Sequence, residues 1–123
     1  MGYMVHHSII VSSWDDRLVK EAHETAVRLF DVPRWRAYSY AGLVSPVVGG
    51  LVNGERSFFI APDGSKEGWP ESDLGDDLRA SFIAYLRSKR YDDGSTSLKW
   101  VEVQFADENN DNRVLQASGD GNG

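Results

Sequence analysis

The sequence predicts an α+β domain in which two helices cover one face of an antiparallel sheet. Two stretches repeat apolar residues at intervals of three and four, which is the spacing of an amphipathic helix. Other stretches alternate apolar and polar residues, as half-buried strands do. An Asn-Gly pair at 53–54 separates two apolar stretches and is a common signature of a tight β-hairpin. We assign 1–106 to a single domain and 107–123 to a polar, disordered tail with an optional short edge strand at 113–117.

The first strand and the first helix are predicted from the residues around 5–33. Apolar residues alternate imperfectly over 5–12, which predicts a mostly buried strand. Ser13 can accept hydrogen bonds from the free backbone N–H groups of a helix start, and Asp15 and Asp16 suit the positive end of the helix dipole. The helix that follows should end just before Pro33, which has no backbone N–H to donate.

A hairpin and a second helix are predicted in the middle of the chain. The hairpin spans 43–61, with its turn at the Asn-Gly pair. The second helix should begin near Asp73, because apolar residues then recur at helical spacing and acidic residues occupy its first turns. Its predicted buried stripe consists of Leu74, Leu78, Phe82, Ile83 and Leu86.

A last strand is predicted at 98–106, where apolar and polar residues alternate. The expected inward side chains are Val101, Val103 and Phe105, and the expected outward ones are Glu102 and Gln104. The element order is then strand, helix, hairpin, helix, strand, which is the βαββαβ order of ferredoxin-like domains with two helices on one face of an antiparallel sheet. That fold supports many unrelated activities and therefore implies no function.

Composition excludes several function classes. The chain of 123 residues has no cysteine, so it has no disulfide, thiolate metal site or cysteine nucleophile. Its net charge of −6 repels nucleic acid, which we do not expect as a direct ligand, and makes basic protein surfaces the more natural partners. No stretch is apolar over the length that a membrane span requires, and no secretory signal is present, so we expect a cytoplasmic protein.

No motif in the sequence predicts catalysis, a metal or a cofactor. His6-His7-Ser8 contains one His-x-Ser element, but a phosphoesterase of the kind that uses such elements needs a second copy. The acidic stretch at 107–112 resembles the start of a calcium loop, yet it lacks the turn glycine and the bidentate Glu. An unfamiliar enzyme site built from His6, His7 and acidic residues is the remaining catalytic alternative.

An arginine- and aromatic-rich segment provides the candidate binding residues. Such side chains can anchor a protein interface or stack on bases, and they can equally pack beneath the sheet as part of the core. Trp69 has the same two interpretations, as a contact for a partner or as an anchor for the second helix. The candidate binding residues are Arg34, Trp35, Arg36, Tyr38, Tyr40 and Trp69.

Three stretches resemble short uncharacterised proteins of tailed phages and prophages: HSIIVSSWD at 7–15, RSFFIAPDGSKEGW at 56–69 and YDDGS at 91–95. The resemblance covers most of 5–106 and carries no catalytic motif. It implies a non-enzymatic protein that binds a host protein, with inhibition of a host defence as one form of that role. A small-molecule or nucleotide-binding domain is the main alternative. Pairing of two copies through an edge strand stays open.

Overall fold

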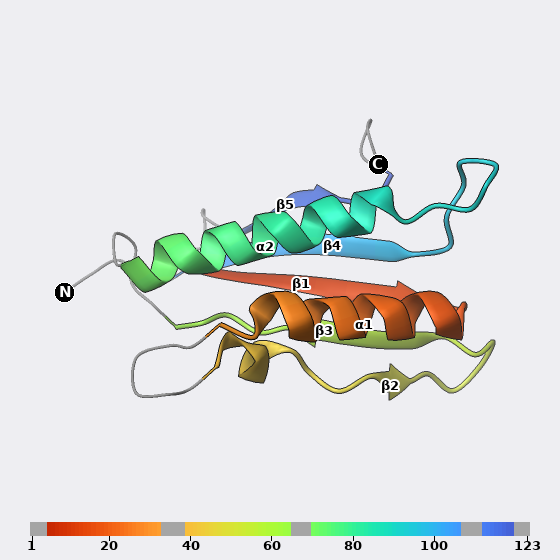
Figure 1. The fold of residues 1–123 in the computed structure, drawn as a ribbon, viewed down its shortest axis with the longest axis horizontal. Coiled ribbons are helices and arrows are strands. Elements are labelled where there is room, and N and C mark those ends of the chain that lie inside the picture. Colours follow the sequence, from red (N-terminus) through yellow and green to blue (C-terminus); the bar gives the residue numbers. More distant parts are fainter. Residues whose placement is uncertain (1–4, 33–38, 65–69, 107–111, 120–123) are drawn as a thin grey trace.

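The computed structural model describes residues 5–32, 39–64, 70–106 and 112–119. These residues form two layers, with both α-helices on the same face of one antiparallel sheet (Figure 1). The helices are α1 (Asp16–Phe30) and α2 (Pro70–Ser88), and a short 3₁₀ helix, η2, spans Tyr40–Leu43. The strands are β1 (Val5–Ser13), β2 (Val48–Gly49), β3 (Arg56–Ile60), β4 (Lys99–Ala106) and β5 (Arg113–Ala117), in the order β2-β3-β1-β4-β5.

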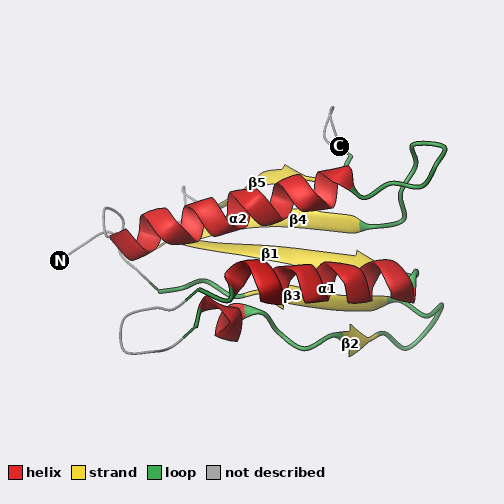
Figure 2. Ribbon diagram, viewed as in Figure 1, coloured by secondary structure: helices red, strands yellow, loops and turns green. Residues whose placement is uncertain are grey.

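The predicted α+β class is confirmed, but the sheet is not the classic ferredoxin-like one. The optional edge strand at 113–117 is present as β5, which pairs antiparallel with β4 and adds a fifth strand to the four of the expected fold. At the opposite edge, β2 has only two residues (Figure 2). The hairpin was predicted to begin at Leu43, but Leu43 is the last residue of η2, and Val44 then makes a single isolated bridge to Ile60.

The helix α1 starts where the sequence predicts, but its capping residue is Asp15 and not Ser13. Asp15 is the N-cap, and its carboxylate accepts hydrogen bonds from the backbone N–H groups of Arg17 and Leu18. The Ser13 hydroxyl accepts a bond from the N–H of Asp15 at 3.0 Å and so supports the cap itself. These bonds satisfy donors that have no partner within the helix. The helix ends at Phe30, as predicted from the following proline.

The predicted hairpin turn is also present. Asn53 and Gly54 both have left-handed backbone angles, with φ of 61° and 68°. Two successive residues in this region characterise the tight turn that matches the twist of antiparallel strands, and Asn and Gly adopt it at low cost. The turn brings Gly49 opposite Arg56 and fixes the register of β2 with β3.

The second helix begins at Pro70 rather than near Asp73. Proline suits the first turn of a helix, where the backbone N–H needs no intrahelical partner, so the helix can extend to this residue. Within the predicted stripe, Phe82, Ile83 and Leu86 are buried, whereas Leu74 and Leu78 are only partly buried. The core lies between the two layers, and its largest fully buried side chains are Tyr40, Phe30, Phe58 and Phe82.

The predicted orientation of the last strand is wrong. In the β1–β4 register, Ile9 lies opposite Glu102 and Val11 lies opposite Trp100, so these four side chains share the helix-covered face. Trp100 and Glu102 are buried there, while Phe105 is exposed on the other face. Val101 and Val103 share the side of Phe105, because side chains alternate along a strand. Burial of the large indole and neutralisation of Glu102 by a helix residue account for the reversal.

Candidate functional site

Of the six predicted binding residues, the structure describes only Tyr40. It is the first residue of η2, and only 2% of its surface is exposed. Tyr40 is thus part of the core, in agreement with the packing interpretation of the aromatic segment. The other five lie outside the described residues: Arg34, Trp35, Arg36, Tyr38 and Trp69. Most of the acidic stretch at 107–112 also lies outside them.

The histidines do not form a shared site. His6 and His7 are adjacent in β1 and therefore point to opposite faces of the sheet. The His6 ring packs against Phe105, with ring centroids 5.1 Å apart, while His7 bonds to Gln104 on the helix-covered face. His23 bonds through Nε2 to the carbonyl oxygen of Ser45 at 3.0 Å. Within the described ranges, no three His, Asp or Glu side chains lie together in a way that could hold a metal ion.

A polar network that sequence reasoning did not predict lies between α2 and the sheet. Its centre is Arg79, whose side chain is only 7% exposed. The guanidinium forms ion pairs with Asp76 and, at 3.7 Å, with Glu102, and one of its nitrogens lies 3.3 Å from Nδ1 of His7. Arginine can only donate, so Nδ1 accepts and the ring proton is on Nε2, which donates to Gln104.

The network continues along the sheet toward the end of α2. The Gln116 side-chain amide donates to Glu102 at 2.8 Å and accepts from Arg87 at 2.9 Å. The Arg87 guanidinium also lies over the Trp100 ring, 4.9 Å from its centroid. A half-open cavity of about 540 Å³ adjoins the network and has Arg113 among its lining residues. Most of these groups already bind one another, so their main effect is to hold α2 against β4 and β5.

The opposite face of the sheet, which we call the open face, has no helix of the described residues over it (Figure 1). It exposes large apolar side chains: 44% of Ile10, 45% of Phe59 and 41% of Phe105 are accessible. Val48 and Val114 lie on the same face, because they pair with Ser57 and Val103. Exposed apolar surface of this kind is typical of interaction sites.

Three further exposed apolar residues lie in the hairpin turn and at the start of α1, where these two segments approach each other. We call this group the hairpin end and define it as Trp14, Leu51 and Val52. Their exposed fractions are 59%, 101% and 70%, so the fold buries little of them. The turn and the helix start are close, since a Cβ atom added to Gly54 would lie 3.9 Å from the Trp14 carbonyl oxygen.

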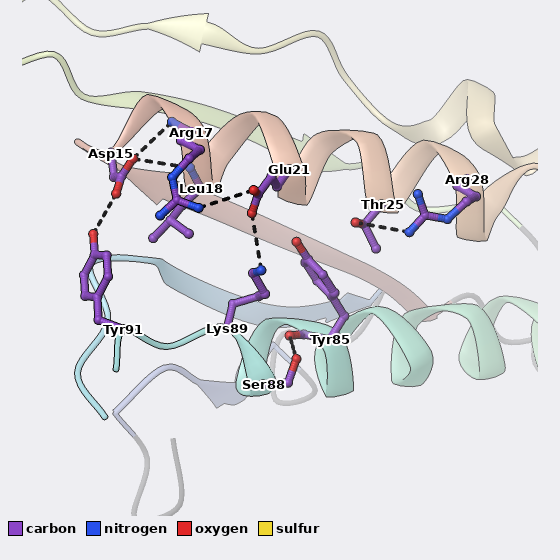
Figure 3. A network of polar contacts seen from close by, with 10 residues as sticks. All are labelled: Asp15, Arg17, Leu18, Glu21, Thr25, Arg28, Tyr85, Ser88, Lys89 and Tyr91. Atoms are coloured by element: carbon purple, nitrogen blue, oxygen red, sulfur yellow. Dashed lines mark hydrogen bonds and ion pairs between the residues drawn. The ribbon is translucent and has the colours of Figure 1, made fainter. Parts of the chain in front are cut away.

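Polar contacts attach the loop after α2 to the same end of the molecule (Figure 3). The Tyr91 hydroxyl donates to the Asp15 carboxylate at 2.7 Å, and this bond is the main reason why the pKa of Asp15 is below its usual value. Bonds from the backbone N–H groups at the helix start lower it further. Further along the helices, Lys89 pairs with Glu21 at 3.3 Å. The exposed Asp92 and Asp93 follow Tyr91 directly and lie beside Arg17 and Arg90, on the side of the molecule away from the turn between β2 and β3 (Figure 1).

Comparison with known proteins gives no assignment: no family model, curated protein or solved structure matches the chain. None of the described helices is both long and apolar enough to cross a membrane.

Proposed function

We propose that the protein is a non-enzymatic binding protein that engages a host protein through the hairpin end. The observation that carries this proposal is the exposure of Trp14, Leu51 and Val52 at the end of the molecule where the hairpin turn approaches the start of α1. Large apolar side chains at a turn do not stabilise the fold when they are this exposed. Tryptophan is among the residues that most often supply the binding energy at protein interfaces, and Leu51 and Val52 would add apolar contact area around Trp14.

The surroundings of the hairpin end favour a partner with an apolar recess and a basic rim. Asp15 and Asp16 follow Trp14 directly, and the whole chain carries a net charge of −6. Acidic groups around apolar anchors steer basic surfaces into contact and are themselves only weakly desolvated. The resemblance to phage proteins supports a bacterial host protein as the partner, with a defence factor as one candidate.

The test is recovery of a partner from bacterial lysate with tagged protein, at low and at moderately high salt. We expect one dominant partner, weakened by salt, that is lost when Trp14→Ala is combined with Leu51→Ser. The matched control is Val27→Ser, because Val27 is also an exposed apolar residue but lies on α1, outside the hairpin end. Equal recovery by both variants, or an empty wild-type bait, would contradict the proposal.

The cavity beside Arg79 supports a second candidate, a small-molecule or nucleotide-binding domain. Arg113 lines this cavity, and no ion pair of Arg113 is present among the described residues. A planar guanidinium of this kind suits a carboxylate or phosphate group. A thermal-shift panel of anionic metabolites separates the candidates, because a ligand that binds the folded state raises the Tm by mass action. The Arg113→Ala variant should then lose the shift.

A further inference from the structure

We propose that the open face pairs with the open face of a second copy of the chain, so that two sheets pack face to face. This goes beyond the proposed function, because it uses another surface of the molecule. The apolar side chains Ile10, Phe59 and Phe105 would be buried between the sheets. Sheets pack in this way at about 10 Å separation, with their strands roughly aligned.

The charge on the open face is what identifies the occupant as a second copy. The centre of the face is uncharged, with Ser8, Ser12 and Ser57 among its apolar side chains, although the protein is acidic overall. Among its described residues the charged side chains are Glu55 and Lys99, one of each sign. Both lie beside Ser12: the Ser12 hydroxyl donates to Glu55 at 3.2 Å, and Lys99 is opposite Ser12 in the β1–β4 register. A strongly basic partner would find no matching acidic surface here.

A two-fold axis along β1 makes these two charges complementary. Glu55 lies just before β3 and Lys99 lies in β4, on opposite sides of β1. Rotation about the axis places the β3 side of one copy over the β4 side of the other. Glu55 then faces Lys99 of the second copy, and the reciprocal pair forms at the same time, as an isologous interface requires.

The apolar side chains of the two copies also fit together when one copy is rotated about this axis. In the row through Ile10, Phe59 lies on the β3 side and Val101 on the β4 side. The rotation places Ile10 over Ile10 and each Phe59 ring over Val101 of the second copy, so that large side chains face smaller ones. The face is only about 20 Å across by the usual strand spacing, which is small for a specific interface, and we expect a dissociation constant on the order of 1 μM or above.

The test is sedimentation velocity over a micromolar concentration series. We expect the wild type to show a monomer–dimer equilibrium. Glu55→Lys and Lys99→Glu each turn two attractions into two repulsions and should weaken pairing about tenfold. The double swap Glu55→Lys/Lys99→Glu should restore it. An equimolar mixture of the two single variants should also pair, because each heterodimer regains both attractive contacts.

Several results would overturn this arrangement. One is a wild type that stays monomeric at every concentration, and another is a dimer whose strength neither single charge variant changes, as pairing through the β5 edge would give. Thermal melts verify that each variant folds, and both charges are accessible at the surface. The hairpin-end variant Leu51→Ser is the control: it should dimerise like the wild type, so loss of dimerisation and loss of host-protein binding can be distinguished.

Discussion

The two faces of the sheet use similar side chains for different purposes. On the covered face, Ile9, Val11 and Phe58 are buried beneath α1 and α2. On the open face, Ile10 and Phe59, their direct neighbours in the chain, remain almost half exposed. The covered face also encloses charged groups, whereas the centre of the open face has none among the described residues. The helices therefore decide which face of the sheet is buried, and the polarity of a side chain does not predict whether that side chain is buried.

The largest difference between the faces should appear on removal of a phenyl ring. Phe82→Ala removes a fully buried side chain from α2 and should lower the free energy of unfolding by about 3–5 kcal/mol. Phe59→Ala on the open face should cost about 1 kcal/mol, because roughly half of the ring is already in water. Urea denaturation of dilute, monomeric protein measures both. Equal losses would mean that the open face is covered in solution.

The charged network provides the next largest effect. Glu102→Ala leaves Arg79 buried with Asp76 as its remaining ion pair on α2, and we expect a loss of about 2–3 kcal/mol. The double variant Arg79→Met/Glu102→Leu should recover most of it, since neither position then carries a buried charge. A double-mutant cycle on the free energy of urea unfolding measures the interaction energy between Arg79 and Glu102. Additive losses would show that the two side chains do not depend on each other.

A glycine in α2 should show an effect of intermediate size. A Cβ atom at Gly75 would lie 2.5 Å from Oδ2 of Asp63 and 3.2 Å from Nη1 of Arg79, which is buried and held by its ion pairs, so Gly75→Ala should destabilise by about 1–3 kcal/mol despite alanine's higher helix propensity. Gly42→Ala is the control, because a Cβ atom there meets nothing within 4 Å. Thermal melts of both variants test this close approach. A stabilised Gly75→Ala would contradict it.

The smallest effect concerns the cap of α1. Asp15→Ala should cost about 1 kcal/mol at neutral pH, because the helix loses its N-cap and Tyr91 loses its acceptor. The pKa of Asp15 is lower in the folded than in the unfolded chain, so its carboxylate stabilises the fold above the unfolded value, near pH 4. That contribution is lost as the pH falls through the folded value. The stability difference between wild type and variant should shrink below about pH 4; a constant difference would contradict the role of the charge.

Local signals in the sequence were sufficient for some elements. The start of α1 and the turn at Asn53-Gly54 are set by short-range backbone chemistry, and the structure confirms both, although Asp15 caps the helix in place of Ser13. Pro70 shows the limit of such signals, because the periodic apolar pattern begins later than the helix does. The position of β5 also depends on pairing with β4, which the local sequence does not specify.

The orientation of β4 could not be read from its own residues. Both of its faces carry large side chains, so alternation alone favoured burying the Val-Val-Phe side. The missing information is in α2, where Arg79 lies at helical spacing from Phe82 and Ile83 on the buried stripe. An arginine in that position requires a buried acidic partner, and Glu102 is the residue that the sheet supplies. A sequence interpretation that paired Arg79 with Glu102 would have predicted the correct orientation of β4.

The central claim, that one face is core and the other is an interface between copies, is tested most directly by carbene footprinting across a protein concentration series. We predict that Ile10, Phe59 and Phe105 are labelled in dilute protein and become protected as concentration rises. Phe58 and Phe82 should stay unlabelled throughout, and Leu51 should stay labelled. The account is contradicted if labelling of Phe59 is independent of concentration, or if protection appears at Leu51 instead.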